Sequence, residues 1–224
     1  MRPDRVPAYI GKMYVPAHFA VDDTQVHELL AHHGAADLVT VTDQGLLATM
    51  LPFVFDPDAG PHGALLGHVA RNNDQWRVPA QGESLVIVRG GADAYFSPGW
   101  YQSKAEHGRV VPTWNYITAH VYGTLVVHDD PGWVENLVRR LTLKHEARME
   151  RPWSVDDAPA PFVAGQLRAI VGVELAITRI EAKAKLSQNR PEADVVGVVA
   201  GLKAQGEDQA ASDVEQANRE RLPH

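Results

Sequence analysis

Residues 170–177 read Ile-Val-Gly-Val-Glu-Leu-Ala-Ile, and residues 183–190 read Lys-Ala-Lys-Leu-Ser-Gln-Asn-Arg. In the first stretch the large apolar side chains occupy every second position from Val171 to Ile177, which is the period of a strand with one buried face. The second stretch has three cations among polar side chains, so it offers many hydrogen-bond donors to a phosphate or a heteroaromatic edge. The two stretches together predict a strand that ends at the rim of a sheet in an anion-binding cluster, and a solvated basic loop is the alternative.

Alternating apolar residues and turn residues predict more strands before this one, at residues 36–42, 46–55, 64–69, 84–89, 94–97 and 111–128. Capping residues and 3.6-residue periodicity predict helices at 22–34, 131–149 and 192–204. Gly123, inside the longest strand, marks a bend or a close approach of two backbones. The order of these elements predicts a mainly β chain with flanking helices, in the α+β class.

Composition limits the classes of protein that need to be considered. The chain has 224 residues, 45% of them hydrophobic and 22% charged, no cysteine and a net charge of −7. We expect one domain at residues 1–204 and a polar, acidic, flexible tail at 205–224. The longest apolar runs are too short to span a bilayer, Met1–Asp4 does not resemble a signal peptide, and a chain without cysteine has a cytoplasmic default location. The negative charge and the lack of a helix-turn-helix pattern make direct DNA binding doubtful.

Two further regions have the chemistry of a ligand site. The segment 67–76 places Arg71 where a strand passes into a turn, which predicts a phosphate cradle. The alternative is a capped turn in which Arg71 is solvated or paired to Asp74. Pro52 has no backbone N–H to donate to a neighbouring strand, so its strand must lack a neighbour at that point. A flat ligand could lie there instead. The aromatic motifs at 95–104 and 111–116 suit a ring-binding slot or a subunit interface, and core packing is the remaining alternative. The spacing of the histidines does not match a metal site, and neither a Gly-x-Ser-x-Gly elbow nor a Gly-rich dinucleotide motif is present.

Taken in order, six motifs resemble those of the PaiB-type, FMN-binding negative transcriptional regulators: residues 13–19, 51–53, 67–72, 97–101, 111–116 and 185–190. The resemblance runs from about residue 13 to 202. It implies a split β-barrel like that of the pyridoxamine-phosphate oxidases, built as a homodimer with FMN in two equivalent clefts between the subunits. It also places the ring of FMN along one strand and its phosphate at a strand-to-turn segment.

The resemblance implies FMN-binding residues in two groups. The first group contacts the ring and the phosphate, and it consists of Thr49, Met50, Leu51, Pro52, His68, Val69, Ala70, Arg71 and Asn72. The second group would come from the partner subunit, and it consists of Trp114, Asn115, Lys185, Ser187, Gln188 and Arg190. Within the first group, Arg71 is the expected phosphate ligand.

The resemblance leaves the task of the flavin open. The expected function is an FMN-binding, homodimeric flavoprotein that senses redox state or acts in regulation. A flavin-dependent oxidoreductase acting on a small molecule is the first alternative, and a haem-binding split barrel with a histidine ligand ranks below it. The sequence identifies no catalytic acid or base.

Overall fold

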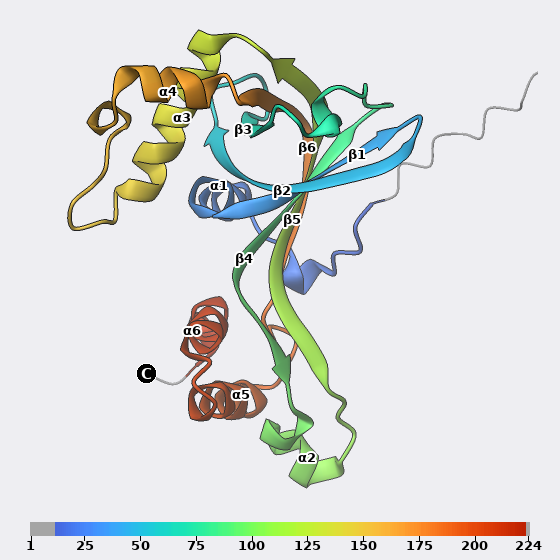
Figure 1. The fold of residues 1–224 in the computed structure, drawn as a ribbon. Coiled ribbons are helices and arrows are strands. Elements are labelled where there is room, and N and C mark those ends of the chain that lie inside the picture. The colour runs from blue at the N-terminus through green and yellow to red at the C-terminus, as the bar shows by residue number, and fades with distance from the viewer. Residues whose placement is uncertain (1–11, 223–224) are drawn as a thin grey trace, which may run out of the picture.

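A computed structural model describes residues 12–222, so the N-terminal segment Met1–Asp4 and the last two residues of the expected tail lie outside the described part. Six antiparallel strands form a closed barrel in the order β1-β2-β3-β6-β5-β4 (Figure 1). Their bounds are β1 Ala35–Thr42, β2 Gly45–Asp56, β3 Ala64–Ala70, β4 Ser84–Phe96, β5 Thr113–His128 and β6 Ile170–Lys185. The predicted mainly β fold of the split-barrel type is confirmed.

The helices surround this barrel and extend beyond it. They are α1 Asp23–His32, α2 Gln102–His107, α3 Pro131–Glu146, α4 Ala160–Leu167, α5 Glu192–Ala204 and α6 Asp208–Ala217. Short 3-10 turns lie at Ala17–Phe19, Asp74–Trp76, Pro98–Trp100, Val155–Asp157 and Arg219–Arg221. None of the helices within residues 12–222 has the length and the apolar character that a bilayer crossing requires.

The barrel interior is filled by alternate residues of all six strands. Leu38, Phe53, Leu65, Val86, Val121 and Leu175 are fully buried there. Helix α1 begins with a capping box in which Asp22 accepts from the backbone of Gln25, and it buries Leu30 in the same core. Helix α3 covers the outside, where Leu137 and Leu141 pack on strands β2 and β3. The core therefore fixes which face of each strand points outward.

Strands β2 and β3 separate at one point, and this opening splits the barrel. Strand β2 pairs with β1 over residues 45–52 but with β3 only over 53–56, where Phe53 faces Gly67. Beyond that pair, β3 continues to Ala70 along β6 alone. Pro52 stands at the separation, as its missing backbone donor predicts. The expected ring-binding and phosphate-binding segments therefore lie on the two sides of this split.

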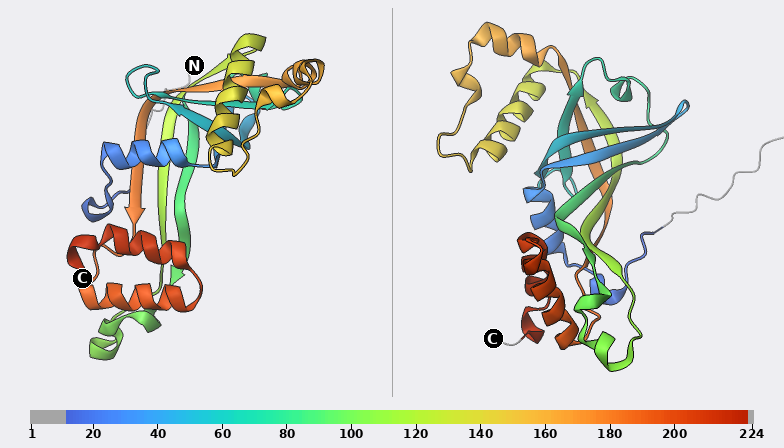
Figure 2. Two further views of the ribbon diagram at one scale, coloured as in Figure 1. Left: turned by 90° about the vertical axis from the view of Figure 1, so that its left-hand side faces the viewer. Right: turned by 60° about the horizontal axis from the view of Figure 1, so that its bottom comes forward.

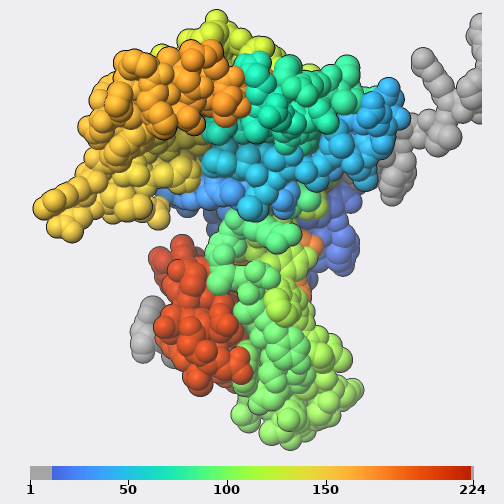
Figure 3. All heavy atoms as spheres, viewed as in Figure 1, coloured from blue at the N-terminus to red at the C-terminus, as the bar shows by residue number. Residues whose placement is uncertain are grey.

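The far ends of β4, β5 and β6 leave the barrel together and form an arm, defined as residues 91–118 and 183–222. The arm ends in α2 on one side and in α5 and α6 on the other (Figure 2). The space-filling view shows the arm as a narrower body below the broad barrel (Figure 3). The molecule thus consists of two regions, the barrel and the arm (Figure 2, Figure 3).

Strand β6 is twice as long as its alternating pattern predicts. Its pairing with β5 shifts register between Tyr122 and Gly123, opposite Thr178. Residues Val171, Val173, Leu175 and Ile177 point inward before this bulge, and Ile180, Ala182 and Ala184 belong to the inner side after it. The predicted strand end at Ile177 is therefore wrong, and the basic cluster begins inside the strand. Gly123 confirms the predicted close approach, because a Cβ there would overlap the carbonyl of Ala176.

The expectation of a flexible tail is wrong for residues 208–221. Helix α6 packs on the arm through Ala210, Ala211 and Val214, all of which are buried. Asn218 follows it and donates from Nδ2 to the carbonyls of Leu186 and Val214, each at 2.9 Å. The small alanine side chains allow α6 to approach closely, and small residues give a weak apolar signal in the sequence.

Candidate functional site

The first group of expected FMN ligands lies around the split. Met50 points outward and is 71% exposed, whereas Leu51 and Val69 point into the core. Thr49 accepts a hydrogen bond at 2.9 Å from Nδ2 of Asn73, which belongs to the turn after β3. Pro52 and His68 are partly exposed, Ala70 and Asn72 are exposed, and burial lowers the pKa of His68. This group therefore presents Met50, Ala70 and Asn72 to solvent rather than all nine residues.

Arg71 is already engaged by its own chain. Its guanidinium donates to both carboxylate oxygens of Asp129 and to the carbonyls of Arg168 and Ile170. The hydrogen bond from Arg71 holds the pKa of Asp129 below its usual range. The alternative pairing of Arg71 with Asp74 is wrong, because Asp74 binds Arg77 at 3.2 Å. Phosphate binding by Arg71 stays a prediction, and in this arrangement the guanidinium has few donors left for it.

Half of the second group shapes the arm, and two of these three residues are buried. Asn115 and Ser187 are 2% and 4% exposed, and their side chains hydrogen-bond to each other at 3.0 Å. Ser187 has a left-handed backbone with φ of 69°, which turns the chain after β6. Gln188 accepts from the backbone N–H of Leu186 and donates to the carbonyl of Ala184. These three side chains hold the loop in place and explain its polar composition without a ligand.

The other half of this group carries charge and ring surface. The ammonium of Lys185 donates to Oγ1 of Thr113 and, at 2.6 Å, to the carbonyl of Trp114. Burial, together with Lys183 and Arg190, lowers the pKa of Lys185. Trp114 is 50% exposed, and Arg190 stacks on the ring of Tyr101 at 4.6 Å. Of these residues, Trp114 borders a large surface cavity.

This cavity, called the aromatic groove, lies on the outer face of β4 and β5 and has a volume of about 540 Å³. Its rings and its charged groups come from both strands and from β6, and they include Arg89, Trp114, Tyr116, His120 and Lys183. Burial lowers the pKa of His120, although Glu181 opposes the shift. The expected site set contains only Trp114 from this group. A signal for Lys183 was the two-residue spacing of Arg179, Glu181, Lys183 and Lys185, which places all four on one face of β6.

Strand register connects the groove with the split. Met50 pairs with Asp37, Asp37 with Ile87, and Ile87 with His120, so these residues form one row across the outer face. Ile87 and His120 line the groove, and two strand spacings put Met50 roughly 10 Å from Ile87. Trp114 lies six residues along β5 from His120, which is roughly 20 Å farther down the arm. The groove therefore starts beside the barrel and ends far from the split.

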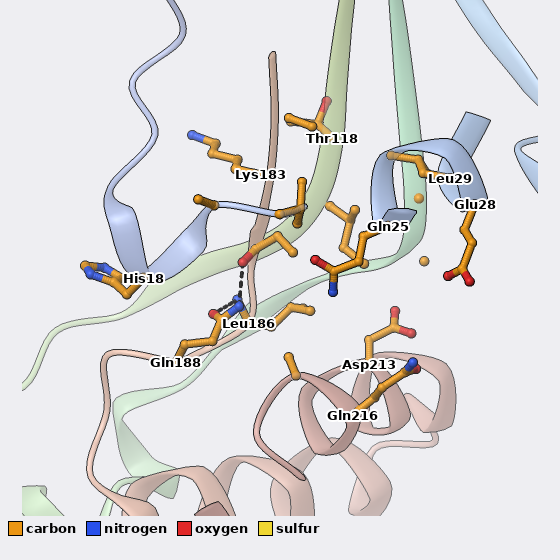
Figure 4. Close-up of a pocket in the computed structure, with 18 residues that line it drawn as sticks. His18, Gln25, Glu28, Leu29, Thr118, Lys183, Leu186, Gln188, Asp213 and Gln216 are labelled. Atoms are coloured by element: carbon orange, nitrogen blue, oxygen red, sulfur yellow. Dashed lines mark hydrogen bonds between the residues drawn. The ribbon is translucent and has the colours of Figure 1, made fainter. Parts of the chain in front are cut away.

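A second pocket of about 430 Å³ lies on the opposite face of the same strands, between α1 and α6. Figure 4 shows Gln25 and Glu28 entering it from α1, and Asp213 and Gln216 from α6. Gln188 from the expected set also lines it. The two pockets share residues of β4, β5 and β6, including Gly90 and Gly91.

Comparison with known proteins agrees with this architecture. Residues 13–179 match the family described as "Putative FMN-binding domain". The chain is 32% identical over 191 residues to the "Protease synthase and sporulation protein PAI 2" of Bacillus subtilis, covering 85% of this chain and 89% of that protein. It is 31% identical to an uncharacterized protein of Emericella nidulans, covering 70% and 75% of the two chains.

Two solved structures share the fold. The flavocytochrome Anf3 of Azotobacter vinelandii superposes with a TM-score of 0.52 at 12% identity, covering 77% of this chain and 72% of that chain. The conserved hypothetical protein Rv2991 of Mycobacterium tuberculosis gives 0.51 at 10% identity, covering 77% and 90%. From the family match and the similarity to PAI 2, the chain belongs to the FMN-binding domain family of PaiB-like proteins, for which FMN is the cofactor.

Proposed function

We propose that the chain is a homodimeric flavoprotein that holds FMN in the aromatic groove and serves in redox sensing or regulation. One observation carries this proposal: the groove combines the ring surfaces of Trp114 and Tyr116 with the cations Arg89 and Lys183. A flavin needs a flat surface for its ring system and charged donors for its phosphate, so these residue types fit FMN. The guanidinium of Arg89 and the ammonium of Lys183 would hold the phosphate.

Two groups that line the groove, Lys183 and His120, can position the ring or exchange protons with it. Lys183 lies over the ring of Tyr116 at 5.1 Å, which keeps its ammonium on the groove face. His120 lies at the barrel end of the groove, and its lowered pKa favours a neutral imidazole that can both donate and accept. Bound FMN supplies reversible hydride and electron transfer. The protein orients it and limits the access of water.

The homodimer rests on apolar side chains that the barrel and arm leave exposed. Leu46 and Met50 on β2, Val41 on β1, and Tyr95 and Trp114 on the arm are between 44% and 71% exposed. Exposed apolar groups along one continuous sheet face are typical of a protein interface. A second chain placed there would cover these groups and bring its own split or arm to the groove. Sedimentation equilibrium should therefore give twice the chain mass, and a monomer would contradict this part of the proposal.

The binding test compares FMN with riboflavin, which has the same ring but no phosphate. Arg89→Gln and Lys183→Gln should each weaken FMN binding by about 1.5–3 kcal/mol, roughly ten- to a hundredfold, and leave riboflavin binding unchanged. Lys104→Gln, on α2 outside the groove, serves as the control. If the affinities for FMN and riboflavin fall equally, or if neither falls, the phosphate binds elsewhere.

A flavin-dependent oxidoreductase is the second candidate, and His120 favours it, because a neutral imidazole beside the flavin can move a substrate proton. Bleaching of the flavin band by NADH or NADPH, followed by reoxidation with a small acceptor, would support this activity. A flavin that is reduced but passes its electrons to no added substrate favours sensing. The same spectrum tests the haem alternative, which requires a Soret band.

A further inference from the structure

The position of Trp114 depends on a β-bulge in the arm. In the pairing of β4 with β5, Gly90 faces Ile117 and Ala94 faces Asn115, so residues 91–93 stand opposite Tyr116 alone. The extra residues leave backbone groups without ladder partners and redirect the side chain of Asp93. The predicted strands at 84–89 and 94–97 are thus one strand interrupted by this bulge.

Asp93 holds the indole of Trp114. The indole Nε1 donates to Oδ2 of Asp93 at 2.7 Å, and both residues line the aromatic groove. Half of Trp114 is exposed, so burial alone does not fix its ring, and its nearest aromatic contact is Tyr95, with ring centroids 6.4 Å apart. A short hydrogen bond to a carboxylate is therefore the strongest directional constraint on the ring.

Helix α6 in turn holds the bulge. Asp213 accepts from the backbone N–H of Ala92 at 3.2 Å through Oδ2, and from Nε2 of Gln209 at 2.9 Å through Oδ1. Gly91 has a left-handed backbone with φ of 61°, and a Cβ at this position would overlap the carboxylate of Asp213. Figure 4 shows Asp213 extending from α6 toward the strands. Glycine at position 91 therefore permits the contact through which α6 fixes the bulge.

We propose that Asp213 and Asp93 are positioning residues for the flavin groove: Asp213 fixes the bulge, and the bulge presents Asp93 to orient Trp114. The part that concerns flavin rests on the proposed function. The connection assigns a role to α6, which lies outside the residues that match the FMN-binding family. Neither carboxylate needs to touch the flavin. Their effect is transmitted through the backbone of residues 91–93 and the indole ring.

The first test needs no flavin and reads the indole ¹H–¹⁵N resonance of Trp114, assigned by its loss in Trp114→Phe. Asp93→Ala should shift this resonance upfield and accelerate its exchange with water, because the hydrogen bond is gone. Asp213→Ala should produce a shift in the same direction although Asp213 does not contact the ring. Asp213→Asn, which retains an acceptor for Ala92, should restore most of the original position, and Asp208→Asn in the first turn of α6 should leave the resonance unmoved.

Far-UV circular dichroism establishes whether α6 is intact in each variant. If Asp213→Ala loses helix, the Trp114 resonance of two other variants decides instead: it should keep most of its original position in Asp213→Asn and shift upfield in Asp93→Ala. Asp93 lies on the surface of the arm, so its substitution should leave α6 intact. A Trp114 resonance that is unchanged in folded Asp213→Ala, or in Asp93→Ala, overturns the positioning role.

The second test adds flavin. Asp93→Ala should lower the affinities for FMN and riboflavin by the same factor, of severalfold, and change the visible circular dichroism of the bound ring. If the indole resonance responds as expected but both flavins bind normally, Asp93 orients Trp114 while the flavin lies elsewhere. That outcome contradicts the proposed flavin groove and the flavin role of Asp93, and it leaves the contact between α6 and the bulge established.

Discussion

Asp194, on the first turn of α5, accepts hydrogen bonds at 2.9 Å from both the backbone N–H and the hydroxyl of Ser103 on α2. Asp194 is fully buried and Ser103 nearly so. Asp194→Ala leaves the backbone donor of Ser103 without a partner, so it should lower the free energy of unfolding by about 1–3 kcal/mol. Urea denaturation measures this change. Glu192→Gln, an exposed carboxylate on the same helix, is the control, and an equal loss there would point to helix electrostatics instead.

Trp114 should contribute to binding of the flavin ring rather than of the phosphate. Trp114→Ala removes a stacking surface worth about 0.5–1.5 kcal/mol, so the affinities for FMN and riboflavin should fall equally, by roughly two- to tenfold. Trp153 is similarly exposed but lies between α3 and α4, away from the groove, and Trp153→Ala should leave both affinities unchanged. Fluorescence titration with the two flavins gives the comparison. A loss confined to FMN would assign Trp114 to the phosphate.

Arg71 and Asp129 offer a paired test of the phosphate prediction. If Arg71 only ties β3 to the ends of β5 and β6, then Arg71→Gln and Asp129→Asn should both lower the melting temperature and leave FMN affinity intact. This is the outcome that the four observed contacts of the guanidinium favour. Selective loss of FMN binding in Arg71→Gln, with normal riboflavin binding, would restore the phosphate role.

His33 should make the fold sensitive to mild acid. It is 5% exposed, its Nδ1 lies 2.6 Å from the carbonyl of Leu30, and its Nε2 has no partner within residues 12–222. Burial, and then the charge of Lys144, lower its pKa from 6.5 to about 4. Because the pKa of His33 is lower in the folded than in the unfolded state, folding favours the neutral imidazole. Its contribution to the free energy of unfolding is therefore complete above pH 6.5. It is lost as the pH falls toward 4, by at most about 3 kcal/mol.

Denaturation at a series of pH values checks this prediction. His33→Asn should flatten the fall in unfolding free energy between pH 6.5 and 4. His32→Asn changes the exposed neighbour and should keep the slope of the original protein. Equal slopes in all three proteins would show that other groups cause the acid sensitivity.

The strands of the barrel were predictable because their alternation is local. The extension of β6 was not, because the bulge opposite Gly123 inverts the alternation between Ile177 and Ile180. Similarly, α6 is held by two alanines and Val214, whose burial depends on the close approach of α5. In both cases a contact distant in sequence decides the local structure.

The candidate site also has one part that could be predicted from local sequence and another part that depends on contacts distant in sequence. Pro52 indicated that its strand is open, and the motif 67–76 indicated a turn after the next strand, since a missing donor and the end of a strand can be recognised from sequence. The split barrel itself was implied by the family resemblance. The groove depends instead on register, which pairs Tyr116 with Lys185 and Thr118 with Lys183. Sequence motifs could not supply that register, so the expected site residues do not include Arg89 and His120, which line the groove.

The distance between the split and the far end of the arm has a genetic consequence. If each flavin site of the homodimer takes the split from one chain and the arm from the other, two inactive alleles can rescue each other. A cell that expresses one chain damaged at the split and another damaged on the arm would assemble mixed dimers in which one of the two sites is wholly intact. Co-expression would then recover up to half of the flavin content per mixed dimer, whereas two alleles altered on the same side would recover none.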